Sequence, residues 1–379
     1  MKFSKSILSL ALASFTYLPS LSWAADDTDD LREQLNELKD EIVILQDQLE
    51  ETNVANANRM NISGYADVEY HNSTQDGKEP GFRLHHMSLF FEKRLTDEWK
   101  FFSEIEYEDA PFLEYEYTDS GTESACEGCY GKIYLEAANF TYSWQPIANF
   151  RAGRFFTPAG IWSVDHYPSF VPTQLRPEHI RRIFPQVVDG VAAFGTLAMG
   201  NSFVNYDVYL GNGEGNSGSA DNNGEKATGA KVALILPFLR YFEIGGSTYS
   251  DTQTDTTSGL DTEKTAIGAH MKVKFANLTF QTEYATADIK PEGSSSYERS
   301  GYYAQLLYDI SKWTFGLRHD VYDANDSDDE EKTFNSVFFN YHVNEAIVLK
   351  LEHHQVTNED STIEDYNHTI ASVVLYLGN

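Results

Sequence analysis

The sequence lacks the long apolar stretch that a membrane-spanning helix needs. Such a helix takes about 20 consecutive apolar residues, and no segment of the 379-residue chain approaches that length. Basic residues are also scarce, because the formal net charge is −30. A nucleic-acid-binding protein presents a basic face to phosphates, so the composition argues against a nucleic-acid partner.

Cysteine is nearly absent, with only Cys126 and Cys129 in the whole chain. In an oxidising compartment we expect this pair to form a disulfide that staples a loop. A redox-active pair is the alternative, since two cysteines at this spacing can have a lowered thiol pKa. Two cysteines alone supply too few ligands for a zinc site.

Motifs of enzymes and of metal sites are missing as well. Serine and histidine occur, but no nucleophile elbow surrounds any serine. The acidic stretch 323–331 lacks the glycine and the ligand spacing of a calcium-binding EF-hand loop. We therefore predict no enzyme, no cofactor and no metal site. We interpret this stretch as a solvated acidic loop, with loose calcium binding as the alternative.

Aromatic residues are abundant, at 14% of the chain, with 23 Tyr and 24 Phe. Without a spanning helix, this excess is typical of a membrane β-barrel, in which aromatic girdles lie at both interfaces. A soluble β-sandwich or propeller has a similar composition, so composition alone leaves that alternative open.

The first 24 residues have the features of a secretory signal peptide. Lys2 and Lys5 form a charged start, an apolar run follows from Ile7 to about Leu18, and the small-x-small site ends at Ala24. We predict cleavage after Ala24 and export of a mature chain that begins near residue 25.

Residues 25–53 have helical spacing of leucines. The apolar positions recur in steps of four and three, which fills both the a and the d sites of a heptad seam. A helix this short is marginal alone, so we expect self-association into a periplasmic coiled coil; a helix docked on its own chain is the alternative. The predicted seam is Leu31, Leu35, Leu38, Ile42, Leu45 and Leu49.

A polar linker, 54–61, precedes a change of period from helical to two. Apolar and ionisable residues alternate over the rest of the chain, as in Ile347, Leu349 and Leu351 against Lys350 and Glu352. We predict an all-β, 16-stranded antiparallel transmembrane barrel over 62–379. The predicted strands are 62–71, 82–94, 98–109, 130–144, 147–155, 186–198, 202–211, 227–237, 240–251, 262–274, 277–288, 299–310, 312–323, 332–343, 345–358 and 366–377.

The connections between these strands alternate in length, seven short and eight long. This alternation is typical of outer-membrane barrels, with tight turns in the periplasm and long loops outside. It places both ends of the barrel on the periplasmic side, where the coiled coil would lie, and predicts membrane lipid and lipopolysaccharide as surroundings.

The longest connection, 156–185, is rich in proline, aromatic residues and arginine. We expect it to fold into the pore and pack its aromatics on the wall. Its cations would then line a constriction that attracts anions. The candidate residues are Arg154, Arg176, His179, Arg181 and Arg182 in or near the loop, and Lys272, Lys274, Arg318 and Lys350 on the wall.

The selectivity of such a pore stays open. Glu104, Glu106, Glu283 and Glu352 share the polar phase with the wall cations, so the predicted lumen is mixed in charge. One interpretation is a preference for anions. The alternatives are weakly cation-selective or unselective transport, in which the loop arginines pair with wall carboxylates and only fix the loop.

The segment Gly153-Arg154-Phe155-Phe156-Thr157-Pro158-Ala159-Gly160 resembles the G-[RK]-F-x-T-P-x-G motif of the phosphate-selective porin O/P family. The resemblance extends diffusely over 62–379. It implies a 16-stranded homotrimer that passes anions or other small solutes, with a third loop folded inward and Arg154 near the constriction.

A structural protein of another class is also compatible with this organisation. A coiled coil joined to a barrel would serve as an envelope tether or an adhesin. A plugged barrel of that kind passes no current in a planar bilayer, whereas a porin does.

Overall fold

The computed structural model describes residues 59–110, 115–117, 123–125, 131–164, 166–214, 221, 223–237, 240–328 and 330–378. The predicted signal peptide (1–24), the coiled coil with Leu31 to Leu49, and the Cys126–Cys129 pair lie outside the described residues. Among the described residues there is no helix long and apolar enough to cross a membrane.

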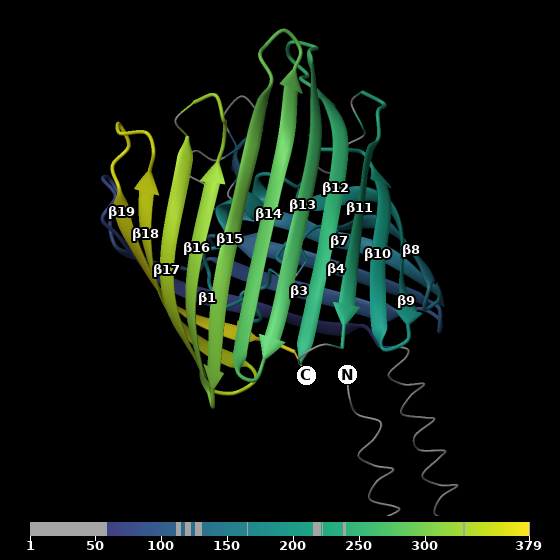
Figure 1. The fold of residues 1–379 in the computed structure, drawn as a ribbon, viewed down its shortest axis with the longest axis horizontal. Coiled ribbons are helices and arrows are strands. Elements are labelled where there is room, and N and C mark those ends of the chain that lie inside the picture. Colours follow the sequence, from purple (N-terminus) through teal and green to yellow (C-terminus); the bar gives the residue numbers. More distant parts are fainter. Residues whose placement is uncertain are drawn as a thin grey trace, which may run out of the picture. The chain divides into compact units, whose positions relative to one another are not determined.

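All the described strands except β5 and β6 form one closed antiparallel sheet (Figure 1). β1 pairs with β3 on one side and with β19 on the other, which closes the ring. β2 and β3 are two parts of one strand, so the barrel has sixteen strands, and β5 and β6 form a small separate hairpin. The strands are β1 (Asn61–Ser73), β2 (Gly81–Arg83), β3 (His86–Arg94), β4 (Trp99–Glu108), β5 (Tyr115–Tyr117), β6 (Glu123–Ala125), β7 (Lys132–Gln145), β8 (Ala148–Phe156), β9 (Val187–Met199), β10 (Ser202–Gly211), β11 (Ala227–Leu236), β12 (Tyr241–Thr254), β13 (Asp261–Phe275), β14 (Leu278–Pro291), β15 (Tyr297–Ile310), β16 (Trp313–Asp323), β17 (Glu331–His342), β18 (Ile347–Asn358) and β19 (Tyr366–Tyr376).

The prediction of a sixteen-stranded all-β barrel is confirmed. Each predicted strand overlaps an observed one, and the ends differ by at most three residues, at the last residues of β12 and β14. Tight turns connect the strands at one rim of the barrel and the longer connections lie at the other (Figure 1). The sequence succeeds here because a strand's two faces meet different surroundings, which imposes a period of two.

The two faces of each strand differ in burial as the alternation requires. On β18, Leu349 and Leu351 are exposed on the outer face, whereas Lys350 and Glu352 are buried on the inner face. An outer face of apolar side chains around an inner face of polar ones is the arrangement of a barrel surrounded by lipid. Further exposed outer residues are Ile62, Val68, Val191, Leu197, Val208, Ile267, Leu317 and Val373.

Aromatic pairs on neighbouring strands lie near the rim of tight turns. The rings of Trp99 and Tyr142 are 5.0 Å apart, and those of Trp313 and Tyr341 are 4.7 Å apart. Each pair joins two adjacent strands close to a turn. Aromatic side chains are favoured at this level of a membrane barrel, because their rings tolerate both lipid and water.

Residues 157–186, between β8 and β9, lie against the inner face of the strands. Ile183 and Phe184 are buried with the small side chains of Ala266, Ala285 and Ala287 on the wall. A second cluster joins Trp162 and Ile180 to Tyr303 of β15. Full burial of such a side chain contributes about 1.5–3 kcal/mol, so several of them keep the segment, here called the inner loop, on the wall.

Candidate functional site: the lumen and its inner loop

Glu283 on β14 holds the start of the inner loop through its backbone. Its two carboxylate oxygens accept hydrogen bonds from the backbone N–H groups of Ile161 and Trp162, with N–O distances of 2.9 and 3.1 Å. The hydroxyl of Tyr303 donates a third hydrogen bond to the same carboxylate, at 2.9 Å. Hydrogen bonds to a charged acceptor contribute about 1.5–3 kcal/mol each. Glu283 is therefore an anchor of the loop.

Two other wall carboxylates repeat this arrangement further along the loop. Glu352 on β18 accepts the N–H groups of Gln174 and Leu175. Asp320 on β16 accepts the N–H of Glu178 at 3.0 Å. Backbone donors of the inner loop thus bind three wall carboxylates, and the sequence placed Glu283 and Glu352 among them on the polar phase.

Wall cations hold the backbone carbonyls of the same loop. The guanidinium of Arg318 donates to the Thr173 hydroxyl and to the Leu175 carbonyl, at 2.7 and 2.8 Å. The ammonium of Lys350 donates to the carbonyls of Pro168 and Val171, at 2.6 and 2.8 Å. Arg318 and Lys350 are only 3% and 4% exposed, so both predicted wall residues lie beneath the loop as anchors.

Gly160 passes directly over the Glu283 carboxylate. Its φ is +49°, and a Cβ at this position would lie 1.7 Å from Glu283 Oε2. Its carbonyl accepts a hydrogen bond from Lys231 of β11 at 2.5 Å. Only a residue without a side chain permits this approach. The structure therefore explains why a glycine stands at the last position of the Gly153–Gly160 segment.

A cavity of about 630 Å³ is lined by the inner loop and by side chains of β3, β4, β7, β8, β10, β11, β12 and β13. Its charged lining consists of the cations Lys100, Arg151, Lys231 and Lys272 and the anions Glu92, Asp207 and Glu243. A second cavity of about 260 Å³ is lined by Lys272, Lys274 and Lys350, with Asp309 and His342.

Two of the three anionic side chains that line the larger cavity have bonded partners. Glu92 forms an ion pair with Lys100 at 2.6 Å. Glu243 is 3.1 Å from the His270 ring nitrogen and also accepts the hydroxyl of Tyr241. These contacts reduce the negative charge that a solute meets in this cavity. The cavity is therefore more positive than the net charge of the chain suggests.

Lys272 and Lys274 lie on the inner face of β13 and both line the cavities, as the sequence indicates. Neither ammonium makes a hydrogen bond or an ion pair within the described part of the chain. A cation without a fixed partner, facing water, is available to a passing anion.

Arg154 is not among the residues that line the larger cavity, and its predicted place near the constriction stays a prediction. It lies in the same phase of β8 as the exposed Phe150, and its guanidinium binds both carboxylate oxygens of Asp189 at 2.7 and 2.6 Å. The strand parity puts Phe155, one residue later, on the inside, where it packs beneath the inner loop. Arg154 therefore joins β8 to β9 through Asp189.

The other predicted loop cations lie in and around a short 3-10 helix, Glu178–Arg181. Arg181 and Arg182 are exposed, and Arg182 pairs with Glu178 at 3.0 Å. Arg176 is half-buried beside Tyr65 and Glu106. His179 is 2% exposed and lies 3.9 Å from Asp320. The structure brings these four residues together at the end of the loop, apart from the lining of the larger cavity.

Three cavity cations were missing from the predicted site: Lys100, Arg151 and Lys231. The polar phase of their strands carries the signal for Lys231, since Lys231 alternates with the apolar Ala230 and Val232. Arg151 gives no such signal in the sequence. In the structure its guanidinium lies over the rings of Phe155 and Phe194, at 5.6 and 4.7 Å from their centroids.

His166 makes the seating of the inner loop sensitive to acid. Its ring is buried against Phe156, and burial, followed by the nearby Arg176, holds the pKa of His166 well below its usual value. When the inner loop leaves the wall, His166 regains its usual pKa. Below about pH 6.5 it therefore binds a proton in the released loop but not in the loop that is packed on the wall. We expect the seated state to have full stability at neutral pH and to lose it as the pH falls below that value.

Hydrogen exchange of the loop amides at pH 7.5 and pH 5.5, corrected for the intrinsic rates, measures this effect. The variant His166→Phe should show a smaller loss of protection at pH 5.5 than the wild type. Equal losses in the two proteins would assign the acid response to other groups.

Comparison with known proteins gives relatives of the fold. No family model matches the chain. A curated protein from Aquifex aeolicus, described as uncharacterized, is 27% identical over 194 residues, which is 51% of this chain and 38% of that protein. The match thus spans well under half of the relative.

Three solved structures resemble the barrel. They are an anion-selective porin from Comamonas acidovorans (TM-score 0.61, 12% identity, 84% of this chain and 99% of that one), the outer-membrane channel DcaP of Acinetobacter baumannii (0.58, 13%, 84% and 97%), and Salmonella typhi OmpF (0.56, 11%, 85% and 99%). At these identities the likeness shows the fold, which is the sixteen-stranded barrel of outer-membrane porins.

Proposed function

We propose that this protein is an outer-membrane porin that forms a water-filled channel for passive diffusion of small hydrophilic solutes, with a preference for anions such as phosphate or carboxylates. The porin fold supports a channel. The resemblance of 153–160 to the phosphate-selective porin O/P motif supports this class of solute, and one structural neighbour is named as anion-selective. A homotrimer, with the N-terminal coiled coil in the periplasm, belongs to the same proposal.

The observation that carries the anion preference is the unequal use of the wall charges. The carboxylates of Glu283, Glu352 and Asp320 are bound to backbone N–H groups of the inner loop. Lys272 and Lys274, by contrast, line the water-accessible cavities without a bonded partner in the described residues. Arg318 and Lys350 are bound to the loop as these carboxylates are. The positive charge that remains near the smaller cavity therefore comes from Lys272 and Lys274.

The reversal potential across a potassium chloride gradient tests this proposal. We expect the wild type to prefer chloride, and Lys272→Gln with Lys274→Gln to lower the chloride-to-potassium permeability ratio. A unit charge about 4 Å from an ion in water changes its energy by about 1 kcal/mol, so the ratio should fall about fivefold. Lys290→Gln is the matched control, because that lysine is exposed near the end of β14.

A wild-type preference for potassium, or no preference, would favour the general-porin alternative. If the double variant keeps the wild-type ratio, the two lysines do not set selectivity. A second variant, in which Arg176, Arg181 and Arg182 are all changed to Ala, tests whether the loop cations contribute. A barrel that passes no current in any condition would instead support a structural role.

A further inference from the structure

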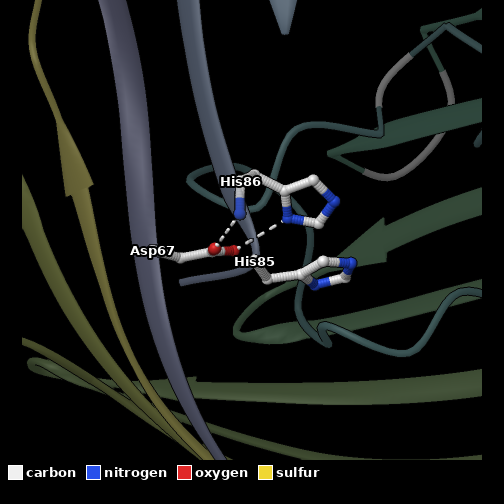
Figure 2. A group of neighbouring side chains, drawn as sticks. All are labelled: Asp67, His85 and His86. Carbon is white, nitrogen blue, oxygen red and sulfur yellow. Dashed lines mark hydrogen bonds and ion pairs between the residues drawn. The ribbon is translucent and has the colours of Figure 1, made fainter. Parts of the chain in front are cut away.

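A group of histidine and carboxylate side chains lies on the inner wall, away from the cavities described above. Asp67 and Glu69 belong to β1, His86 begins β3, and His85 immediately precedes it. Figure 2 shows the rings of His85 and His86 side by side, next to the carboxylate of Asp67. The group lies near the rim of long connections, since the loop between β1 and β2 follows Ser73.

A local irregularity of the strand brings the two neighbouring histidines together. Glu69 is opposite Arg83 in β2, whereas Ala66 is opposite Met87 in β3, so the register shifts by one residue between them. In a regular strand, successive side chains point to opposite faces. Here the extra residue leaves the ring centroids of His85 and His86 only 3.5 Å apart. Bulges of this kind re-aim side chains and are frequent beside functional sites.

The positions of the ligand atoms suit a metal ion. One nitrogen or oxygen atom from each of Asp67, His85 and His86 lies within 4.8 Å of the others. His86 Nδ1 is 3.1 Å from Asp67 Oδ2, and His85 Nδ1 is 3.1 Å from Glu69 Oε1. A single ion can replace contacts of this length by shorter bonds to the same atoms.

Neighbouring groups hold the carboxylates of Asp67 and Glu69 in place. The backbone N–H of His86 and the side-chain amide of Gln174 donate to Asp67, at 2.7 and 3.1 Å. Glu69 is 1% exposed; its Oε1 lies 3.1 Å from His85 Nδ1, and its Oε2 lies 2.6 Å from His71 Nε2. Buried carboxylates need a cation or hydrogen-bond donors beside them, and a bound divalent ion would serve Asp67 and Glu69 together.

The wall around the group is acidic. Glu106 and Glu108 each place a carboxylate oxygen near the His86 ring as well. Arg176 of the inner loop is the nearby cation that acts on His86. Arg83 acts on Glu69 and Glu108, and Lys350 acts on Asp67 and Glu69. The carboxylates still outnumber these cations, which leaves negative charge to be neutralised by a bound cation.

We propose that Asp67, His85 and His86, with Glu69 beside them, form a binding site for a divalent transition-metal ion such as zinc. Imidazole and carboxylate together are the ligands of zinc, and three protein ligands leave a position for water or a solute. Calcium prefers a set made only of oxygen atoms. The site would place a fixed positive charge on the acidic part of the wall, near the rim of long connections.

Calorimetric titration with zinc chloride tests the site. The untagged full chain is used in detergent micelles, with its cysteines alkylated so that no thiol competes as a ligand. We expect one zinc ion per chain with micromolar or tighter affinity, and no displacement by an equal concentration of calcium. The variant His85→Gln with His86→Gln should bind at least about tenfold more weakly. The matched control is His319→Gln with His353→Gln, two exposed histidines on the outer face.

Absence of zinc binding by the wild type, or an equal loss in the control, would overturn the proposal. Folding of each variant is checked by heat-modifiable gel mobility, and only folded protein is titrated. If the double variant does not fold, the single variants His85→Gln and Asp67→Asn test the site, because each removes one ligand. Wild-type zinc affinity in both single variants would also overturn the proposal. The titration needs no current, so its result is independent of whether the channel prefers anions.

Discussion

Glu283→Ala should release the inner loop from the barrel wall while the barrel stays folded. The change removes the acceptor for the N–H groups of Ile161 and Trp162 and for the hydroxyl of Tyr303. With charge-assisted bonds of about 1.5–3 kcal/mol each, opening of the loop becomes easier by about 3 kcal/mol or more. The exchange of the Ile161 and Trp162 amides should then be about 100-fold faster.

Hydrogen exchange followed by mass spectrometry measures this result, and single-channel recording supplies a second readout. We expect a larger and noisier conductance, because the released loop no longer keeps a fixed place in the lumen. Glu283→Gln should give a smaller effect, since one of its two acceptors remains. Glu263→Ala is the control, because this exposed glutamate lies on the outer face of β13. Unchanged exchange in Glu283→Ala would show that apolar packing alone seats the loop.

Gly153→Val should prevent closure of the barrel. Gly153 has a φ of +119°, and a Cβ there would lie 2.3 Å from the carbonyl oxygen of Ala138 on β7. The next nearest atom would be the Cα of Asn139, at 2.9 Å. Both contacts involve backbone, which cannot rotate away as a side chain does. A β-branched residue at this φ is strongly disfavoured, so we expect the pairing of β7 with β8 to fail and most of the protein to stay unfolded.

The fraction of protein that migrates as the heat-modifiable folded form on a gel measures this effect. Gly200→Ala is the matched control: its φ is also positive, at +64°, but nothing lies within 4 Å of the position of a Cβ. The control should lose only about 1 kcal/mol, the cost of the left-handed backbone. A Gly153→Val barrel that folds as well as this control would contradict the proposed clash.

The strands were predictable from the sequence because the residues of each strand alternate according to the lipid on one face and the lumen on the other. Leu349 and Leu351 alternate with Lys350 and Glu352, so the local pattern alone marks a strand with one apolar face. The lengths of the connections then give the order and direction of the strands. None of these inferences needs a contact between distant residues.

The roles of the charged wall residues were not predictable in the same way. The sequence places Glu283, Arg318 and Lys350 on the inner face, but their partners are backbone groups of the inner loop, more than 100 positions away. Arg154 shows a second limit. Phe155 packs beneath the loop and Phe150 faces outward, so both faces of β8 carry aromatic residues and the alternation does not reveal which side is the lumen.

The histidine group shows a third limit. Strict alternation would place His85 and His86 on opposite faces, and it is the one-residue shift of register between β2 and β3 that brings them together. The sequence carries no mark of this shift, which depends on how β1 pairs with both halves of the interrupted strand.

The inner loop is attached to the wall mainly through its main chain. Ile161, Trp162, Gln174, Leu175 and Glu178 are held by their N–H groups, and Pro168 and Val171 by their carbonyls. Such attachment does not depend on which side chain a residue carries, provided that its backbone keeps the same path. The loop can therefore exchange the side chains that point at a solute without losing its support. This separation makes it a suitable place to graft new selectivity onto an unchanged barrel.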